Sequence, residues 1–234
     1  IDLGGHRSSG IMAVAYKRLK DHLGITTGDI YVYDMMQQLA IIEPPVLERF
    51  GVDTIELGRG FALHPKDWRD WELPDGAPCK IPAHIRPLRD RGGGWRIEHE
   101  DGALLGVQRP GCWYFEQTHY PLAEAQGDDW DLDEAFDHTM GAHIGTPPAP
   151  LTYADDDLAL LAEGARALRA RTDRAIIGLF GGNLLEAGQG LFRNDNFFLL
   201  LAGEPRRAHR FLDRLVERHL ENLERFCAAV GPYI

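Results

Sequence analysis

The sequence predicts an α/β fold built on a parallel sheet. The clearest signal is the stretch 175–194, AIIGLFGGNLLEAGQGLFRN, in which an apolar run over 175–180 is followed by a Gly-Gly-Asn turn and a helical pattern. An apolar, β-branched run of that length is typical of a strand that is buried on both faces, as strands of parallel sheets are. The second signal is the alternation of short apolar runs with amphipathic segments over residues 1–61, which favours βαβ units.

Strands and helices are expected in alternation at both ends of the chain. The expected strands cover residues 1–3, 30–33, 54–57 and 175–180. The expected helices cover residues 11–23, 35–40, 46–50, 155–171, 197–202 and 206–230. The first of these helices has Val14 and Leu19 on its apolar side, and Gly24 is suited to end it in a left-handed conformation.

The middle of the chain, residues 62–150, differs from both ends because prolines, glycines and tryptophans are frequent and helical periodicity is absent. The runs 95–99 and 104–108 are joined by Glu-Asp-Gly, and Asp-Gly is a strong signal for a hairpin turn. A third strand is expected at 112–116. We therefore predict one domain over residues 1–234, with a β-rich subdomain inserted at 62–150.

Charge and composition argue against several kinds of partner and location. A formal charge of −11 disfavours nucleic acid and anionic membrane surfaces, because both attract clustered cations. No apolar run approaches the ~20 residues of a membrane-spanning helix, and no signal-peptide pattern opens the chain. Cys79, Cys112 and Cys227 lie far apart and lack a C-x-x-C spacing, so reduced thiols of a cytoplasmic protein are expected.

Both ends of the sequence indicate a segment of a longer protein. The chain begins at Ile1 without a methionine, and it ends at Ile234 directly after the pattern of a long helix. In an alternating α/β chain, the next expected element at that point is a strand.

Four features together resemble the uroporphyrinogen decarboxylase superfamily. They are an aspartate at a strand end (Asp34), the run DRAII at 173–177, the turn FGGN at 180–183, and a long helix that leads into VGPYI at 230–234. The resemblance covers residues 1–61 and 153–234. It is closer to the uroporphyrinogen decarboxylase-like members and to their corrinoid-dependent methyltransferase relatives.

The resemblance implies a (β/α)₈ barrel of the TIM-barrel type. This chain would hold the N-terminal half of that barrel, with residues 62–150 as an insertion on one of its loops. The carboxyl ends of barrel strands meet at one rim, where the chemistry of such enzymes takes place. His6, Asp34, Arg59 and Asn183 are therefore expected to lie together at that rim.

Six residues are the candidates for a site at this rim. Asp34 falls at a position like that of the family's catalytic aspartate, so the resemblance implies a catalytic role. The substrate-binding candidates lie in or beside the expected loops: His6, Arg7, Arg59, Asn183 and Glu186. Each candidate also has a structural interpretation. Asp34 could cap the helix expected at 35–40, and Gly181 and Gly182 could form a tight turn rather than hold a phosphate.

The binding candidates have ordinary interpretations too. His6 and Arg7 could be loop residues without a ligand. Arg59 could pair with Glu56, and Glu186 could be a first-turn acid that favours the helix dipole.

For the reaction, the resemblance implies methyl transfer. The authentic decarboxylase carries an RQAGRY motif after its first strand, whereas this chain has GGHRSSG at residues 4–10. The methyltransferase relatives move a methyl group between cobalamin and a thiol or another acceptor, usually with zinc. Their zinc ligands would fall beyond Ile234, so no residue of this chain is assigned to a metal. A small methylated substrate and a corrinoid protein as partner are expected on the same ground, and a homodimer stays open.

Two other functions stay open. One is decarboxylation of uroporphyrinogen or of another carboxylated molecule, with Asp34 stabilising a protonated intermediate. A substrate with eight carboxylates needs several cations, and the expected rim offers only Arg7 and Arg59, which favours a smaller substrate. The other is a non-catalytic binding or regulatory protein that kept the barrel and lost the site.

Overall fold

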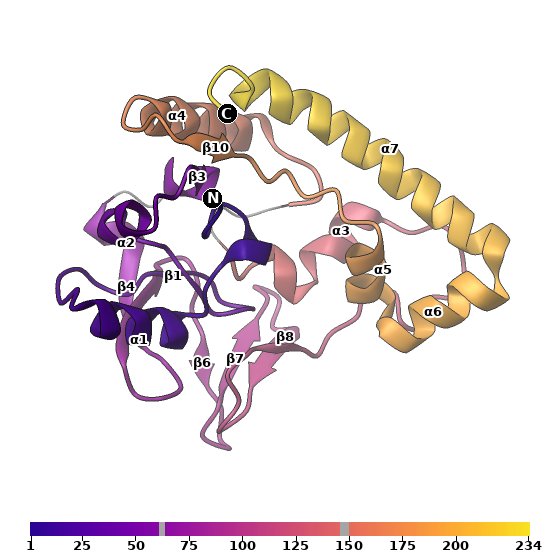
Figure 1. Cartoon of the computed structure of the whole chain (residues 1–234). Coiled ribbons are helices and arrows are strands. Elements are labelled where there is room, and N and C mark those ends of the chain that lie inside the picture. Colours follow the sequence, from indigo (N-terminus) through magenta and orange to yellow (C-terminus); the bar gives the residue numbers. More distant parts are fainter. Residues whose placement is uncertain (61–63, 146–149) are drawn as a thin grey trace.

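Four small sheets and seven α-helices make up the part of the chain that the structure describes. The structure is a computed structural model. It describes all residues except 61–63 and 146–149, and it does not describe the side chain of Arg59. The sheets pair β1 with β2, β3 with β10, and β4 with β5, and the largest has the order β6-β7-β8-β9. Figure 1 shows the long helix α7 along one side of the molecule, with β6, β7 and β8 at the opposite side.

The barrel expected from the resemblance is not formed, so the predicted TIM-barrel fold class is wrong. Among the strands in the described residues, the only parallel pair is β3 (Thr54–Glu56) with β10 (Ala175–Ile177), in which Ile55 lies opposite Ile176. The remaining strand pairs are antiparallel, and the small sheets do not join into a closed ring.

The hydrogen bonds of residues 30 and 31, which lead directly into β1 (Val32–Asp34), explain why a larger parallel sheet does not form. Ile41 N–H donates to the carbonyl of Tyr31 at 2.8 Å, and Lys80 N–H donates to the carbonyl of Ile30 at 2.7 Å. Successive carbonyls of a strand point to opposite sides, so both edges of the strand are occupied. Neither edge is left for β3.

The chain folds back after β1 instead of entering the helix expected at 35–40. Residues 35–38 form a turn, and β2 (Leu39–Ala40) then pairs antiparallel with β1. Gln38 has a φ of +56°, and its side-chain amide donates to the carbonyl of Met35 at 2.8 Å. This buried bond supports a left-handed conformation that residues other than glycine adopt rarely.

The other N-terminal elements follow the sequence pattern more closely. Helix α1 (Ala13–Leu23) ends at Gly24, whose φ of +70° confirms the predicted left-handed cap. Helix α2 (Pro44–Arg49) starts with two prolines, which suit the first turn of a helix. The strand expected at 1–3 is absent as a strand, although the carbonyl of Ile1 accepts the N–H of Asp53 at 2.8 Å.

The middle of the chain is rich in strands, as expected. The strands are β4 (Trp68–Glu72), β5 (Pro78–Pro82), β6 (Leu88–Arg89), β7 (Trp95–Glu98), β8 (Leu104–Gln108) and β9 (Glu116–Gln117). The β7–β8 hairpin is confirmed, whereas the third strand, expected at 112–116, is the shorter β9. Ile81 and Leu105 are fully buried in the same core as Val32, so these strands pack against the N-terminal elements.

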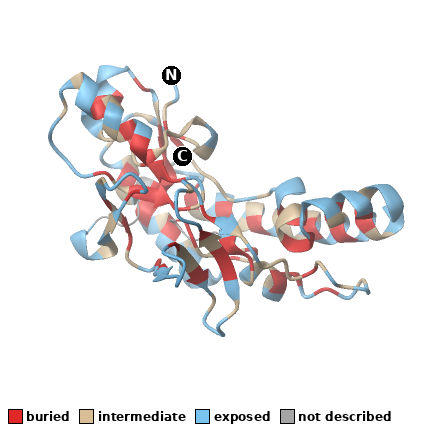
Figure 2. Ribbon diagram, turned by 90° about the horizontal axis from the view of Figure 1, so that it is seen from below, coloured by how far each residue is buried: buried red, intermediate tan, exposed pale blue. Residues whose placement is uncertain are grey.

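The helices of the second half pack around two apolar cores. They are α3 (Leu132–Asp137), α4 (Asp155–Arg169), α5 (Leu185–Phe192), α6 (Asn194–Gly203) and α7 (Pro205–Val230). Helix α7 contributes Phe226 and Val230 to the main core, and Phe211 and Leu215 to a second core. Figure 2 shows the buried positions of α7 as patches along a helix whose other side is exposed. None of the described helices is both long and apolar enough to cross a membrane.

Four short 3₁₀ helices complete the fold: η1 (Arg7–Ser9), η2 (Leu57–Gly60), η3 (Pro65–Asp67) and η4 (Met140–Ala142). The first of them lies in the N-terminal loop, and the last ends a few residues before the described part of the chain breaks off at Gly145. Both carry or adjoin residues of the candidate site.

Candidate functional site

Asp34 ends strand β1, and its carboxylate is nearly buried. The residue is 2% exposed, and Oδ1 accepts the N–H of Gln37 at 2.9 Å. Asp34 was expected to cap a helix at 35–40 if its role is structural. The bond to Gln37 shows that it caps a turn at 35–38 instead. It uses only one oxygen of the carboxylate.

The second oxygen of Asp34 faces Arg7, the first residue of η1. Arg7 Nε lies 3.3 Å from Asp34 Oδ2, and the Arg7 side chain is about one-third exposed. A guanidinium carries five N–H donors in a planar fork, so this contact leaves donors for another acceptor. The structure thus brings two predicted site residues, Arg7 and Asp34, into one ion pair.

Gly145 forms a wall beside this pair. Asp34 and Gly145 form an antiparallel bridge, and Met35 N–H donates to the carbonyl of Ile144 at 2.9 Å. A Cβ atom on Gly145 would lie 2.9 Å from Arg7 Nη2, which is closer than real contacts allow without a shift. The guanidinium can therefore lie where it does because residue 145 has no side chain.

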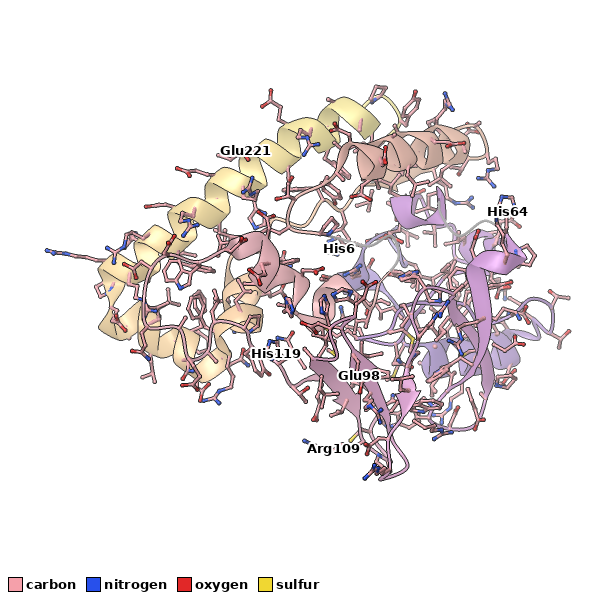
Figure 3. All side chains as sticks on the ribbon, turned by 180° about the vertical axis from the view of Figure 1, so that it is seen from behind. His6, His64, Glu98, Arg109, His119 and Glu221 are labelled. Atoms are coloured by element: carbon pink, nitrogen blue, oxygen red, sulfur yellow. The ribbon has the colours of Figure 1, made fainter. Side chains whose placement is uncertain are left out.

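The N-terminal loop fixes the position of Arg7. His6 caps η1, because its ring Nδ1 accepts the N–H of Ser8 at 3.0 Å. Asp2 Oδ1 accepts the N–H of Gly5 at 2.9 Å and the hydroxyl of Thr54 at 2.6 Å. Figure 3 shows His6 on this loop, near the middle of the molecule. His6 therefore acts on the site through the conformation of the loop.

The pKa of Asp2 reflects the same contacts. Burial raises this pKa, but hydrogen bonds from Thr54, Ser9 and Gly5, together with the nearby His6, outweigh burial and hold the pKa below its usual value. An ionised Asp2 keeps the loop attached to the first residue of β3.

Tyr153 is a site residue that the sequence analysis missed. It is 3% exposed, and its hydroxyl donates to the carbonyl of Phe180 at 3.4 Å. Burial, followed by the charge of Asp157, raises the pKa of Tyr153 to about 12, while the charge of Arg7 acts in the opposite direction. The phenol thus lies within the electrostatic reach of Arg7 and contacts the residue that precedes Gly181. Its one sequence signal is an aromatic residue just before the acidic start of α4.

Asn183 and Glu186 contact each other and helix α7. The Asn183 amide donates to the Glu186 carboxylate, and the carbonyl of Asn183 lies 3.3 Å from His219 Nε2. Both residues are exposed. Gly181 and Gly182 have φ values of +96° and +84°, which glycine adopts readily, but residues 181–183 form neither a hydrogen-bonded turn nor a bend, so the tight-turn interpretation is not confirmed. These residues lead the chain from Phe180 toward α7.

Arg59 belongs to η2, but its side chain lies outside the described residues. Glu56, the acid with which Arg59 was expected to pair, is buried at the end of β3. The interpretations of Arg59 as an anion-binding residue and as a partner of Glu56 both stay predictions.

Two overlapping groups of side chains could hold a metal ion, and neither includes a predicted site residue. One consists of His99, Asp101 and His138, and the other of His99, Asp137 and His143. At Asp34 the paired side chains are a carboxylate and a guanidinium, which is not the imidazole and thiolate set that zinc prefers.

Comparisons of the chain with models of protein families, with curated proteins and with solved structures found no match. The site geometry is therefore what supports a function. It consists of a buried carboxylate, a partly exposed guanidinium paired with it, and a phenol within the electrostatic reach of that guanidinium.

Proposed function

We propose that this chain carries part of the substrate site of an enzyme that acts on a small anionic molecule. In this site Asp34 faces the reacting part of the substrate, and Arg7 holds its anionic group. The observation that carries the proposal is the burial of the Asp34 carboxylate against a guanidinium that is still partly exposed. A turn cap needs only an uncharged acceptor such as Asn or Ser, whereas a buried charge needs a partner and is costly to desolvate.

For the reaction, we propose methyl transfer linked to a corrinoid protein, with a small methylated molecule as substrate. The support is the resemblance of the motifs around Asp34, 173–177 and 180–183 to corrinoid-dependent methyltransferases. Zinc and cobalamin would supply the methyl transfer chemistry, and no residue around Asp34 is assigned to hold either of them. Arg7 would bind and orient the substrate, and Asp34 would hold a proton or a positively charged group of the substrate in place.

Decarboxylation of a carboxylated molecule is the second candidate, and the Arg7–Asp34 pair itself favours it. A guanidinium binds carboxylates in a bidentate manner. A buried carboxylate next to it could stabilise the positive charge that develops when the substrate is protonated before carbon dioxide leaves. In this reaction Arg7 would hold a carboxylate that stays on the product.

The reaction can be assigned with the full-length protein. Consumption of methylcobalamin is followed by absorbance with zinc and thiol acceptors, and release of carbon dioxide is followed with uroporphyrinogen and smaller carboxylated molecules. Activity in the first assay supports methyl transfer, and activity in the second supports the decarboxylase candidate. Binding without turnover in both would favour a non-catalytic protein and contradict the proposal.

The role of Arg7 is tested with the same assays. Arg7→Gln removes the charge while keeping hydrogen-bond donors, and the Michaelis constant for the anionic substrate is expected to rise by at least tenfold, about 1.4 kcal/mol of binding. Arg18→Gln on helix α1 is the matched control. Equal Michaelis constants for wild type and Arg7→Gln would remove Arg7 from the site.

A further inference from the structure

A group of histidines and aspartates lies on the inserted strands and on the segment that follows α3. His99 and Asp101 belong to the connection between β7 and β8, and His138 directly follows α3. His119, which is labelled in Figure 3, follows β9. Its ring centroid lies 6.2 Å from that of His138. Two sequence-distant segments therefore bring imidazoles and carboxylates together.

Asp101 lies between two imidazole rings. Its Oδ1 is 2.9 Å from His99 Nδ1, and its Oδ2 is 2.9 Å from His138 Nε2. The two rings are also close to each other, with centroids 4.2 Å apart. The histidine side chains are 13% and 21% exposed and that of Asp101 is 55% exposed, so the group is open to solvent on the side of the carboxylate.

The other nitrogen of each ring already has an acceptor. His99 Nε2 lies 3.1 Å from a carboxylate oxygen of Asp137, and His138 Nδ1 lies 2.9 Å from the carbonyl of Glu134. Both partners only accept hydrogen bonds, so each of these nitrogens carries the proton of a neutral ring. The nitrogens that face Asp101 then carry lone pairs, and His99 Nδ1 also accepts the backbone N–H of Asp101 at 3.4 Å.

Each of these lone pairs lies 2.9 Å from a carboxylate oxygen of Asp101, and a positive charge between them stabilises this arrangement. Either protons or a metal ion can supply this charge. Metal-bound histidines almost always donate their second N–H to a carboxylate or a backbone carbonyl, which fixes the ring orientation. Asp137 and the Glu134 carbonyl provide these two kinds of partner.

We propose that His99 Nδ1, His138 Nε2 and the Asp101 carboxylate bind a divalent transition-metal ion of the zinc class. The three ligand atoms lie within 4.8 Å of one another. With metal–ligand bonds of about 2.0–2.2 Å, tetrahedral ligands are spaced by roughly 3.3 Å, so modest side-chain rotations complete the site. Two imidazoles and one carboxylate are a set that zinc accepts, with a fourth position left for water or another ligand.

The neighbouring group of His99, Asp137 and His143 is less suited to the ion. His143 Nε2 faces the carbonyl oxygen of Asp137, so this nitrogen donates and has no lone pair for a metal. In the proposed site Asp137 instead orients His99, which makes it a positioning residue.

The ion would join the β7–β8 connection to the end of α3. Residue 138 leads through η4 to Ile144 and Gly145, which contact the turn after Asp34 and the Arg7 guanidinium. Metal binding at His138 is therefore expected to stabilise the position of Ile144 and Gly145 next to the Arg7–Asp34 pair as well.

Binding is tested on the full-length protein after it has been freed of metal with a chelator. Zinc is titrated by calorimetry at pH 7.5, and cobalt(II) is added as a spectroscopic probe. We expect an imidazole-bound cobalt spectrum and zinc binding that weakens at least 100-fold in both His99→Gln and His138→Gln. His22→Gln, at an exposed histidine of α1, is the matched control and keeps wild-type affinity.

A second variant keeps the test decisive if the ligand variants fold poorly. Asp137→Asn leaves all three ligands in place and is expected to weaken zinc binding by about 10–100-fold, as loss of an outer partner does. The proposal is overturned if wild type binds zinc no more tightly than His99→Gln and Asp137→Asn. It is also overturned if the cobalt spectrum of wild type is that of the hydrated ion.

Discussion

Arg7 Nε lies 3.3 Å from Asp34 Oδ2, and this contact joins the N-terminal loop to the end of β1. The carboxylate is buried while the guanidinium is partly exposed, so a ligand can reach the pair from the side of Arg7. Gly145 limits the space around the guanidinium, and the charge of Arg7 lowers the pKa of Tyr153 against the effect of burial.

Removing the charge of Arg7 should destabilise the fold, because it leaves the Asp34 carboxylate buried without its partner. We expect Arg7→Met to lower the free energy of unfolding by roughly 1–3 kcal/mol, less than for a fully buried pair since Arg7 is partly exposed. Urea unfolding of Arg7→Met, Asp34→Asn and the double variant measures the coupling between the residues. Strictly additive effects would show that the pair does not interact.

A side chain at residue 145 should displace the Arg7 guanidinium. We expect Gly145→Ala to raise the Michaelis constant for the substrate several-fold, because its Cβ would lie 2.9 Å from Arg7 Nη2. Gly203→Ala is the matched control, since a Cβ there meets nothing within 4 Å. Equal Michaelis constants for Gly145→Ala and wild type would place the Arg7 guanidinium elsewhere.

Asn222 on α7 should be important for stability near Tyr153. It is 2% exposed, its amide donates to the carbonyl of Leu151, and its Oδ1 accepts the N–H of Tyr153 at 3.4 Å. Asn222→Leu leaves these two backbone groups without their partner and should cost about 1–3 kcal/mol in urea unfolding. Glu224→Leu, at an exposed position of the same helix, should change stability by no more than about 0.5 kcal/mol. Equal effects of the two variants would contradict this role.

Stability should fall at alkaline pH because of Cys79. Burial, with the charges of Asp75 and Glu72, raises the pKa of this thiol from 9.0 to about 12. Between these values the folded protein keeps the proton that the unfolded chain loses. The contribution of Cys79 to the free energy of unfolding is therefore complete below pH 9. It declines as the pH rises toward 12, by roughly 1.4 kcal/mol per pH unit.

Urea unfolding between pH 8 and 10.5 measures this decline. Cys79→Ala should be less stable than wild type at pH 8 but should lose less stability as the pH rises. Tyr153, whose pKa is raised to about 12, remains in both proteins and accounts for the residual decline. Parallel curves for the two proteins would mean that the Cys79 thiol ionises equally in the folded and unfolded states.

Local patterns in the sequence predicted much of the secondary structure. The helices at 11–23, 155–171 and 206–230 correspond to α1, α4 and α7, because each has an apolar stripe of helical period. The hairpin at 95–108 is confirmed because Asp-Gly favours its turn. These signals depend on neighbouring residues, which a single sequence contains.

Sheet pairing was predicted poorly because it depends on distant segments. The pattern of residues 30–33 indicated a buried strand, but not that Lys80 and Ile41 would occupy its two edges. The turn at Gln38 was missed for a similar reason, since its left-handed conformation is supported by a buried side-chain bond. The barrel expectation was wrong for these reasons.

Of the residues that form the candidate site, the sequence analysis named the two that make the ion pair. Arg7 was named as a candidate from its loop and Asp34 from its place at a strand end and the resemblance, and the structure shows them paired. Gly145 and Tyr153 come from segments whose position relative to β1 no local pattern reveals. The histidines around Asp101 were missed for the same reason, because His138 is brought to the β7–β8 connection by tertiary packing.

The turnover of Asp34→Asn tests the central claim most directly. This variant keeps an oxygen that can accept the Gln37 N–H, so it retains the turn cap while removing the charge. In the assay that detects wild-type activity, we expect turnover to fall at least tenfold, about 1.4 kcal/mol of barrier, with wild-type circular dichroism. Asp21→Asn, in an exposed ion pair on α1, should keep wild-type turnover. Undiminished turnover of Asp34→Asn would return Asp34 to the role of a turn cap and contradict the proposed site.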